Sequence, residues 1–125
     1  MASNTSPLAS VELGVPRLAG SNSRAHWTRR SRDAHADRQT AHVLGLAAKP
    51  TKPMDSVRLT IDWWCPTRRM LDCDNALSRC KAYIDGLTDA GWWVDDKAIR
   101  TVEITVHPPG ERRGAVVITA RPACP

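Results

Sequence analysis

Three stretches of the chain alternate apolar and polar residues with a period of two, which indicates strands that bury one face. They run from Val11 to Val15, from Val57 to Trp63 and from Val102 to Val106. A fourth run with the same period, from Val116 to Ala120, follows the turn-forming segment Pro108–Gly114. We therefore predict four strands, with the second one central in the sheet and the last two joined as a hairpin.

A segment rich in alanine and arginine separates the first two predicted strands. It follows the helix-breaking cluster 20–23, in which Asn22 or Ser23 is suited to cap a helix, and it extends to about Ala47. The prolines of the segment 49–53 cannot continue a helix, so these residues are predicted to form a linker. The first long helix should therefore lie between the first and second strands.

A second helix is predicted between the second and third strands. It should open at Asp72 or Asp74, extend to about Ala90 and end at the cap residue Gly91. The apolar residues that recur at helical spacing and should form its buried face are Leu77, Cys80, Ile84 and Leu87. This order of elements predicts an α+β fold, in which two helices pack against a mixed sheet of about four strands.

The composition limits the class of protein. Residues 1–125 are assigned to a single domain because the chain is too short for two cores, and residues 1–10 are expected to be poorly ordered. The formal net charge of +5 favours a polyanionic partner. The chain has no signal-peptide pattern and no apolar run of membrane-spanning length, so we expect a cytoplasmic protein that contacts no membrane.

The cysteines and histidines give little support for a zinc site. The cysteines Cys65, Cys73, Cys80 and Cys124 contain no C-x-x-C pair, and the four histidines lack the spacing of a zinc-binding helix. An intracellular protein is expected to keep these thiols reduced. Zinc is therefore not expected.

The sharpest chemical feature is an acidic cluster around the second helix. Asp72 and Asp74 stand at its start in the motif D-C-D-N, and Asp95 and Asp96 come just beyond its end. Carboxylates that converge on one point repel one another unless a cation is present, and oxygen ligands without sulfur suit Mg²⁺ or Mn²⁺. Such an ion could hold a phosphate and activate a water molecule.

A polar stripe is predicted along the same helix. At about 100° per residue, the residues that share this stripe beside the apolar face are Asp74, Ser78, Lys81 and Asp85. Polar groups in such positions lie at the rim of the core, where a cleft would form. An ammonium group there, on Lys81, could stabilise the charge of a pentavalent phosphate or orient the water.

Each of these residues also has an ordinary structural explanation. An aspartate at a helix start is commonly an N-cap, Lys81 and Asp85 form an ordinary i,i+4 pair, and two adjacent aspartates suit a turn. Other proteins with a D-x-D motif fit less well. A calcium loop would need an acid or amide at Ala76 and glycine at Leu77. A haloacid-dehalogenase-type phosphatase would place its aspartate directly at a strand end, and a nucleotide-sugar transferase would need a longer chain.

Three segments together resemble the core signature of the RusA family of Holliday-junction resolvases. They are Arg68–Asn75 (RRMLDCDN), Lys81–Leu87 (KAYIDGL) and Asp89–Asp96 (DAGWWVDD), and the similarity extends over roughly residues 61–106. Arg24–Trp27 with the arginines after it is similar to the early helix of actinobacterial and phage members. The resemblance implies a bacterial or phage endonuclease that cuts four-way or branched DNA as a homodimer. It also implies Mg²⁺ as cofactor, with Mn²⁺ as a substitute, and no small-molecule cofactor.

The resemblance also assigns roles to residues. Those implied to hold Mg²⁺ are Asp72, Asp74 and Asp96, with Asp95 beside the metal, and those implied in catalysis are Asp72, Asp74, Lys81 and Asp96. Many family members place the lysine four residues after the second aspartate, where this chain has Ser78. The offset of seven found here returns to the same helix face, about one turn further along the axis.

Arginine and tryptophan residues are candidates for DNA contacts. The arginines expected to touch phosphates are Arg24, Arg29, Arg30, Arg68 and Arg69, with Arg32, Arg112 and Arg113 as further candidates. Trp63 is predicted to lie in the core, whereas Trp64, Trp92 and Trp93 are candidates for a dimer interface or for base stacking.

Two alternatives to a junction-cutting enzyme stay open. A non-catalytic junction-binding module would keep the fold and the basic surface, and the altered lysine spacing is the feature that supports it. A metal-dependent phosphatase acting on small substrates would turn over phosphate esters and show no salt-dependent affinity for DNA.

Overall fold

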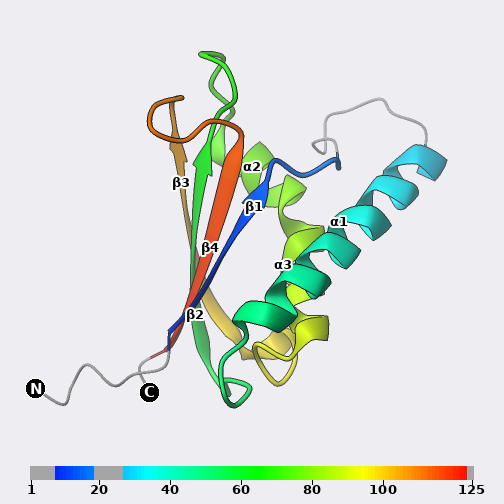
Figure 1. Ribbon diagram of the computed structural model, residues 1–125, viewed down its shortest axis with the longest axis vertical. Coiled ribbons are helices and arrows are strands. Elements are labelled where there is room, and N and C mark those ends of the chain that lie inside the picture. The colour runs from blue at the N-terminus through cyan, green and yellow to red at the C-terminus, as the bar shows by residue number, and fades with distance from the viewer. Residues whose placement is uncertain (1–7, 19–26, 124–125) are drawn as a thin grey trace, which may run out of the picture.

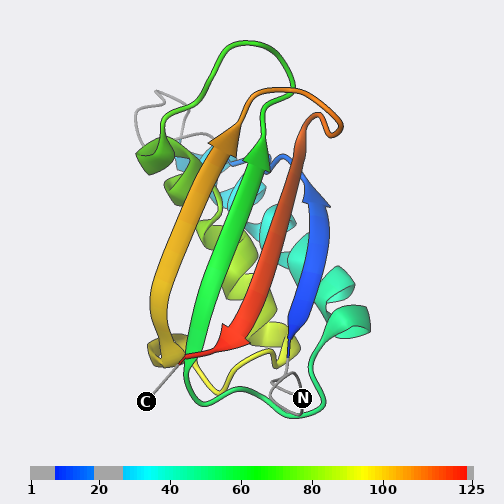
Figure 2. The ribbon, with the colours of Figure 1, turned by 90° about the vertical axis from the view of Figure 1, so that its left-hand side faces the viewer.

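The computed structural model describes residues 8–18 and 27–123, and the structural statements below concern these residues. The strands are β1 (Ala9–Gly14), β2 (Val57–Trp64), β3 (Ile99–His107) and β4 (Ala115–Pro122). The helices are α1 (Trp27–Ala48), α2 (Cys73–Arg79), α3 (Lys81–Ala90) and the short 3-10 helix η2 (Asp96–Ala98). Helices α1 to α3 cover one face of the sheet and leave the other face open (Figures 1 and 2). The predicted α+β fold with a four-stranded mixed sheet is confirmed, although three helices rather than two cover it.

The strands lie in the order β1-β4-β2-β3, so the predicted hairpin between the last two strands is wrong. β4 runs antiparallel to β1 and to β2, whereas β3 runs parallel to β2 on its other side. The segment 108–114 therefore carries the chain past the end of β2. The inward side chains of β2 are Val57, Leu59, Ile61 and Trp63, each at most 1% exposed. β2 pairs with β4 on one side and β3 on the other, so the prediction that it is central is confirmed.

The single helix predicted from Asp72 or Asp74 to Ala90 is two helices, which is a second correction. α2 ends and α3 begins on either side of the buried Cys80, whose backbone N–H is shared between the carbonyls of Ala76 and Leu77. Because the two helices do not share one repeat, Leu77 is 38% exposed instead of buried. The predicted polar stripe is interrupted at the same point. The predicted cap at Gly91, with a left-handed φ of 89°, is confirmed.

Helix α1 approaches α3 closely because glycines stand where the helices meet. A Cβ at Gly86 would collide with the carbonyl oxygen of Arg38 and lie 2.8 Å from the Cβ of Ala41. A Cβ at Gly45 would lie 2.7 Å from a methyl carbon of Leu87. Small residues therefore set the distance between α1 and α3.

The tryptophans of the core include two that were candidates for surface roles. Trp92 and Trp93 are 0% and 1% exposed, so their prediction as interface or stacking residues is wrong. The indole N–H of Trp92 donates to the carbonyl of Gly45 at 2.9 Å, and that of Trp93 donates to the hydroxyl of Thr88 at 2.7 Å. Their ring N–H groups are thus satisfied inside the protein, as burial requires. Trp63, at 1% exposed, lies in the core as predicted.

The ends of the predicted elements differ slightly from the structure. β1 begins at Ala9, within the segment expected to be poorly ordered, and residues 1–7 lie outside the described residues. The predicted helix caps Asn22 and Ser23 also lie outside them, and α1 is described from Trp27. The linker 49–53 is neither helix nor strand, as predicted. Among the described helices, none combines the length and the apolar character needed to cross a bilayer.

Candidate functional site

The D-C-D-N motif lies at the start of α2. Oδ1 of Asp72 accepts a hydrogen bond from the backbone N–H of Asn75 at 2.8 Å, so Asp72 is the N-cap of the helix. Asp74 follows in the first turn, and both aspartates are exposed. The second carboxylate oxygen of Asp72 has no hydrogen-bond partner among the described residues. The ordinary cap role is therefore present, and it leaves carboxylate oxygens at the surface for a ligand.

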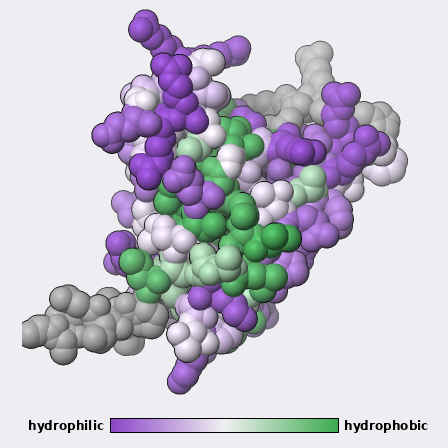
Figure 3. Space-filling model, viewed as in Figure 1, coloured by the Kyte–Doolittle hydropathy of each residue, from purple (hydrophilic) through white to green (hydrophobic). Residues whose placement is uncertain are grey.

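Two arginine-bearing loops lie at the same end of the sheet as this motif. The loop 66–71 leaves β2 there, because Trp64, the last residue of β2, is in register with the last residue of β3 and the first of β4. The loop 108–114 joins those two strands at the same end (Figure 2). The exposed arginines are Arg68 and Arg69 on the first loop and Arg112 and Arg113 on the second. Hydrophilic residues accordingly cover this end of the molecule in Figure 3.

The other predicted DNA contacts lie on or before α1. Arg29 and Arg30 stand in its first turn and Arg32 in its second, and Arg29 and Arg32 are exposed. Figure 1 shows that α1 begins toward the same end of the molecule as α2. Arg24 lies outside the described residues.

The second acidic pair lies at the opposite end of the sheet. Asp95 caps η2, since its Oδ1 accepts the backbone N–H of Lys97 at 2.8 Å, and Asp96 is the first residue of η2. η2 leads directly into β3, whose first residue is in register with the first residue of β2. The eight residues of β2, which rise by about 3.3 Å from one to the next, separate the two ends by roughly 23 Å. Accordingly, no three His, Cys, Asp or Glu side chains in the described part of the chain could hold a metal ion together.

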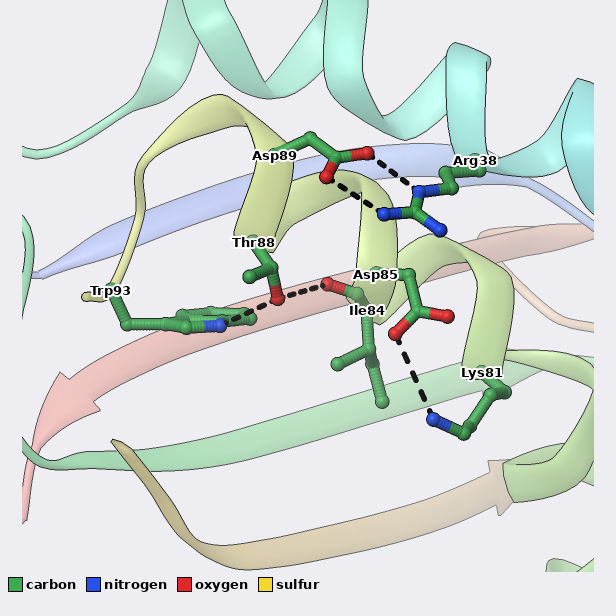
Figure 4. Close-up of polar contacts among 7 residues, drawn as sticks. All are labelled: Arg38, Lys81, Ile84, Asp85, Thr88, Asp89 and Trp93. Carbon is green, nitrogen blue, oxygen red and sulfur yellow. Dashed lines mark hydrogen bonds and ion pairs between the residues drawn. The ribbon is translucent and has the colours of Figure 1, made fainter. Parts of the chain in front are cut away.

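Lys81 stands on the exposed surface of α3. Its Nζ lies 3.7 Å from Oδ1 of Asp85, the i,i+4 pair that the spacing predicts, and its side chain is 73% exposed. Figure 4 shows this pair beside the ion pair of Arg38 with Asp89. Arg38 donates to both carboxylate oxygens of Asp89, at 2.6 and 2.9 Å, and these hydrogen bonds lower the pKa of Asp89. Lys81 is therefore paired with a carboxylate of its own helix.

Trp64 stands on the open face of the sheet near the two loops. Its ring stacks on that of His107, with centroids 4.6 Å apart, and the guanidinium carbon of Arg112 lies 5.0 Å from the Trp64 centroid. His107 Nε2 in turn lies 2.8 Å from Oδ1 of Asp62. Side chains of the protein itself therefore pack on this ring, and its role toward DNA or a partner remains a prediction.

Sequence reasoning missed an arginine that the structure holds in one orientation. Arg79, at the end of α2, donates from Nε to the carbonyl of Leu18 at 2.9 Å and from Nη2 to the carbonyl of Pro16 at 3.1 Å. Its guanidinium carbon lies 5.1 Å from the ring centroid of Trp63. No spacing pattern joins residues so far apart in the chain, so the sequence contains no signal for this arrangement.

The family model described as "Endodeoxyribonuclease RusA" matches residues 13–120, which include α1, α2, α3, β2 and β3 entirely and most of β4. An uncharacterized protein of Xylella fastidiosa (strain Temecula1 / ATCC 700964) is 35% identical over 102 residues. That match covers 78% of this chain and 65% of the relative, so the chain spans just under two thirds of the relative's length. The extent of the family match shows that this chain belongs to the RusA family of endodeoxyribonucleases.

Proposed function

We propose that this protein is a divalent-metal-dependent endonuclease that resolves four-way and other branched DNA in recombination, repair or phage DNA processing. The observation that carries the proposal is the position of Asp72 and Asp74 directly after the arginine loop 66–71, at one end of the sheet. Arg68 and Arg69 would bind backbone phosphates without reading sequence. The carboxylates would then act on the phosphodiester held beside them.

The residues at the start of α2 suit a hard divalent cation. Asp72 and Asp74 offer carboxylate oxygens, and the side-chain oxygen of Asn75 is buried without a hydrogen-bond partner in the described part of the chain. Oxygen donors of this kind match Mg²⁺, with Mn²⁺ as a substitute. When bound, the ion would activate a water molecule and stabilise charge on the phosphate. The cap hydrogen bond of Asp72 would hold its carboxylate in place for this role.

Lys81 is proposed to assist at the phosphate. A surface ion pair with N···O at 3.7 Å stabilises little, so Asp85 does not hold the ammonium group firmly. Because the Lys81 side chain is 73% exposed, its Nζ can turn from Asp85 to a phosphate oxygen of bound DNA. This movement would let Lys81 act at the phosphate although it forms an i,i+4 ion pair with Asp85 when no DNA is bound.

We further propose that two copies of the chain share each active site. One chain keeps its two acidic pairs a strand's length apart, and both α2 and η2 lie beside the β3 edge of the sheet (Figure 2). A two-fold axis across this edge would bring Asp72 and Asp74 of one copy to Asp95 and Asp96 of the other. β3 is an edge strand with four consecutive exposed residues, 100–103, and such an edge can pair with another chain. The dimer would present two sites to a two-fold junction.

The decisive experiment compares cleavage of a labelled four-way junction with that of a linear duplex of the same sequence. Wild type, Asp74→Asn and the control Asp55→Asn, which changes an exposed acid just after the linker, are each assayed with Mg²⁺ and with EDTA. We expect paired symmetrical nicks in the junction alone, dependent on metal and on Asp74 but not on Asp55. Junction binding without cleavage at any Mg²⁺ or Mn²⁺ concentration would instead favour the binding module. Turnover of chromogenic phosphate esters without DNA affinity would favour the phosphatase.

A further inference from the structure

We propose that a cavity beside the D-C-D-N motif binds an unpaired nucleobase next to the scissile phosphate, and that Arg79 contacts acceptor atoms of that base. This inference rests on the proposed nuclease function and adds to it a site that reads sequence. It joins three observations: the size and lining of the cavity, the fixed orientation of Arg79, and a buried carboxylate that supports this orientation.

The cavity lies between the loop 66–71 and the end of β1. Its volume is about 320 Å³, near the lower end of the roughly 300–1,000 Å³ found for small-ligand pockets. Its main apolar walls are Val15, Trp63, Met70 and Leu71, and its cations are Arg69 and Arg79. Leu71 directly precedes Asp72, so a group in the cavity lies next to the proposed catalytic carboxylates. Arg69 and Met70 are exposed, so the cavity opens to the surface on their side.

The Arg79 guanidinium is oriented before any ligand arrives. Two backbone carbonyls accept its hydrogen bonds and its central carbon lies over the ring of Trp63. Among the described residues no carboxylate forms an ion pair with it. A guanidinium has five N–H donors, so the two backbone contacts leave others for a ligand. Arginine commonly recognises a base by paired hydrogen bonds to two acceptor atoms on its edge. The geometry therefore places an uncompensated, rigid donor at the wall of an otherwise largely apolar cavity.

Asp37 holds in place the backbone segment to which Arg79 donates its hydrogen bonds. It is a buried charged residue, 2% exposed, and its carboxylate accepts the backbone N–H groups of Arg17 at 2.9 Å and Leu18 at 2.8 Å. Burial of a carboxylate is unfavourable unless hydrogen bonds compensate it. These bonds fix the segment whose carbonyls, at Pro16 and Leu18, hold Arg79. A buried charge on α1 is thus used to position a second charge at the cavity.

The dimensions and position of the cavity favour an unpaired base as the occupant. Apolar side chains on its walls suit the uncharged ring of a base, and the two arginines suit a ligand that carries acceptor atoms and a phosphate. A base pair within a duplex is too wide for the cavity, so the base must leave its stack. Leaving the stack is least unfavourable where pairing is already interrupted, as at a branch point. The cavity would therefore connect recognition of the branch with a sequence preference at the cut.

The test uses four-way junctions that differ only in the bases flanking the cut. We expect wild type to prefer one base by roughly tenfold or more, the effect of one paired arginine contact. Arg79→Lys keeps the charge but loses the planar fork, so cleavage next to the preferred base should fall toward the rate at the other bases and most of the preference should disappear. Arg121→Lys, an exposed arginine at the other end of the sheet, is the matched control and should keep the preference. Thermal unfolding of each variant shows whether the fold is retained.

A second variant and a second readout keep the test decisive. Thr67 is exposed at the cavity, so Thr67→Trp should fill the cavity without disturbing the contacts of Arg79, and it should also flatten the preference. A junction with 2-aminopurine at the branch should become more fluorescent when it binds the Asp74→Asn variant, which does not cut it. The double variant that also carries Thr67→Trp should give a smaller rise. An unchanged preference in both Arg79→Lys and Thr67→Trp, or none in wild type, would overturn the inference while leaving the nuclease proposal intact. Failure of wild type to bind or cut any junction would overturn both.

Discussion

Oδ1 of Asp72 accepts the backbone N–H of Asn75 at 2.8 Å, so the carboxylate proposed as a metal ligand is also the cap of α2. Serine is an equally good cap but has no carboxylate. We therefore expect Asp72→Ser to abolish cleavage with little change in the free energy of unfolding, whereas Asp72→Ala should lose cleavage and about 1 kcal/mol of stability. Denaturant unfolding and junction cleavage, measured on both variants, separate the two roles. Normal cleavage by Asp72→Ser would leave Asp72 as a cap alone.

The separation of the two acidic pairs leads to a prediction about mixed dimers. If each site takes Asp74 from one copy and Asp96 from the other, a dimer of Asp74→Asn with Asp96→Asn has one fully intact site. Random exchange makes about half of the dimers mixed, so two inactive proteins should together recover about a quarter of the wild-type sites. Nicking of a four-way junction, measured before and after the two variants are denatured and refolded together, gives this fraction.

A control mixture tests whether recovery requires the two changes to lie in different acidic pairs. Asp74→Asn mixed with Asp72→Ser should stay inactive, because both changes lie at the start of α2 and every possible dimer then lacks an intact site. If the first mixture also stays inactive although native mass spectrometry shows mixed dimers, each site belongs to one chain. Full cleavage by Asp96→Asn alone would instead show that the acidic pair at η2 serves only as a turn.

The elements were predictable where the pattern of buried positions is local. Alternation along Val57–Trp63 fixes a strand and its buried face, and Gly91 marks a helix end wherever the helix packs. The break at Cys80 was not predictable, because Leu77 to Leu87 keep helical spacing in the sequence and only packing exposes Leu77. Strand order likewise depends on which strands fill the interior. The parallel direction of β2 and β3, with α2 and α3 running back between them, places Asp95 and Asp96 far from Asp72.

The two loop arginines should set the salt dependence of DNA binding. Each phosphate contact releases counterions, so Arg68→Ala with Arg69→Ala should weaken junction binding and reduce the slope of log K against log salt by about two. Arg121→Ala removes an exposed arginine at the other end of the sheet and serves as the control, with its slope unchanged. Titrations at several salt concentrations measure all three slopes. An unaltered slope in the double variant would remove this loop from the DNA interface.

The close approach of α1 and α3 predicts a strong effect of one methyl group. Gly86→Ala would place a Cβ against the backbone of Arg38 and against Ala41, so the helices must separate, which should destabilise the fold by about 1–3 kcal/mol. Gly110→Ala is the control, since no atom lies within 4 Å of a Cβ there. Denaturant unfolding compares the two variants. Equal stability would mean that the α1–α3 contact adjusts without loss.

The buried Cys80 predicts both a chemical and a thermodynamic dependence on pH. Burial raises the pKa of its thiol from 9.0 to about 12, so the folded chain keeps this proton where an unfolded chain loses it. The contribution of this thiol to the free energy of unfolding is fully present below pH 9. It should fall as the pH rises from about 9 toward 12. In a Cys124→Ser background at pH 8, iodoacetamide should label the exposed Cys73 and should spare Cys80 until the protein unfolds. Mass spectrometry of the labelled peptides measures this order, and equally fast labelling of both thiols in the native protein would show that the junction between α2 and α3 opens in solution.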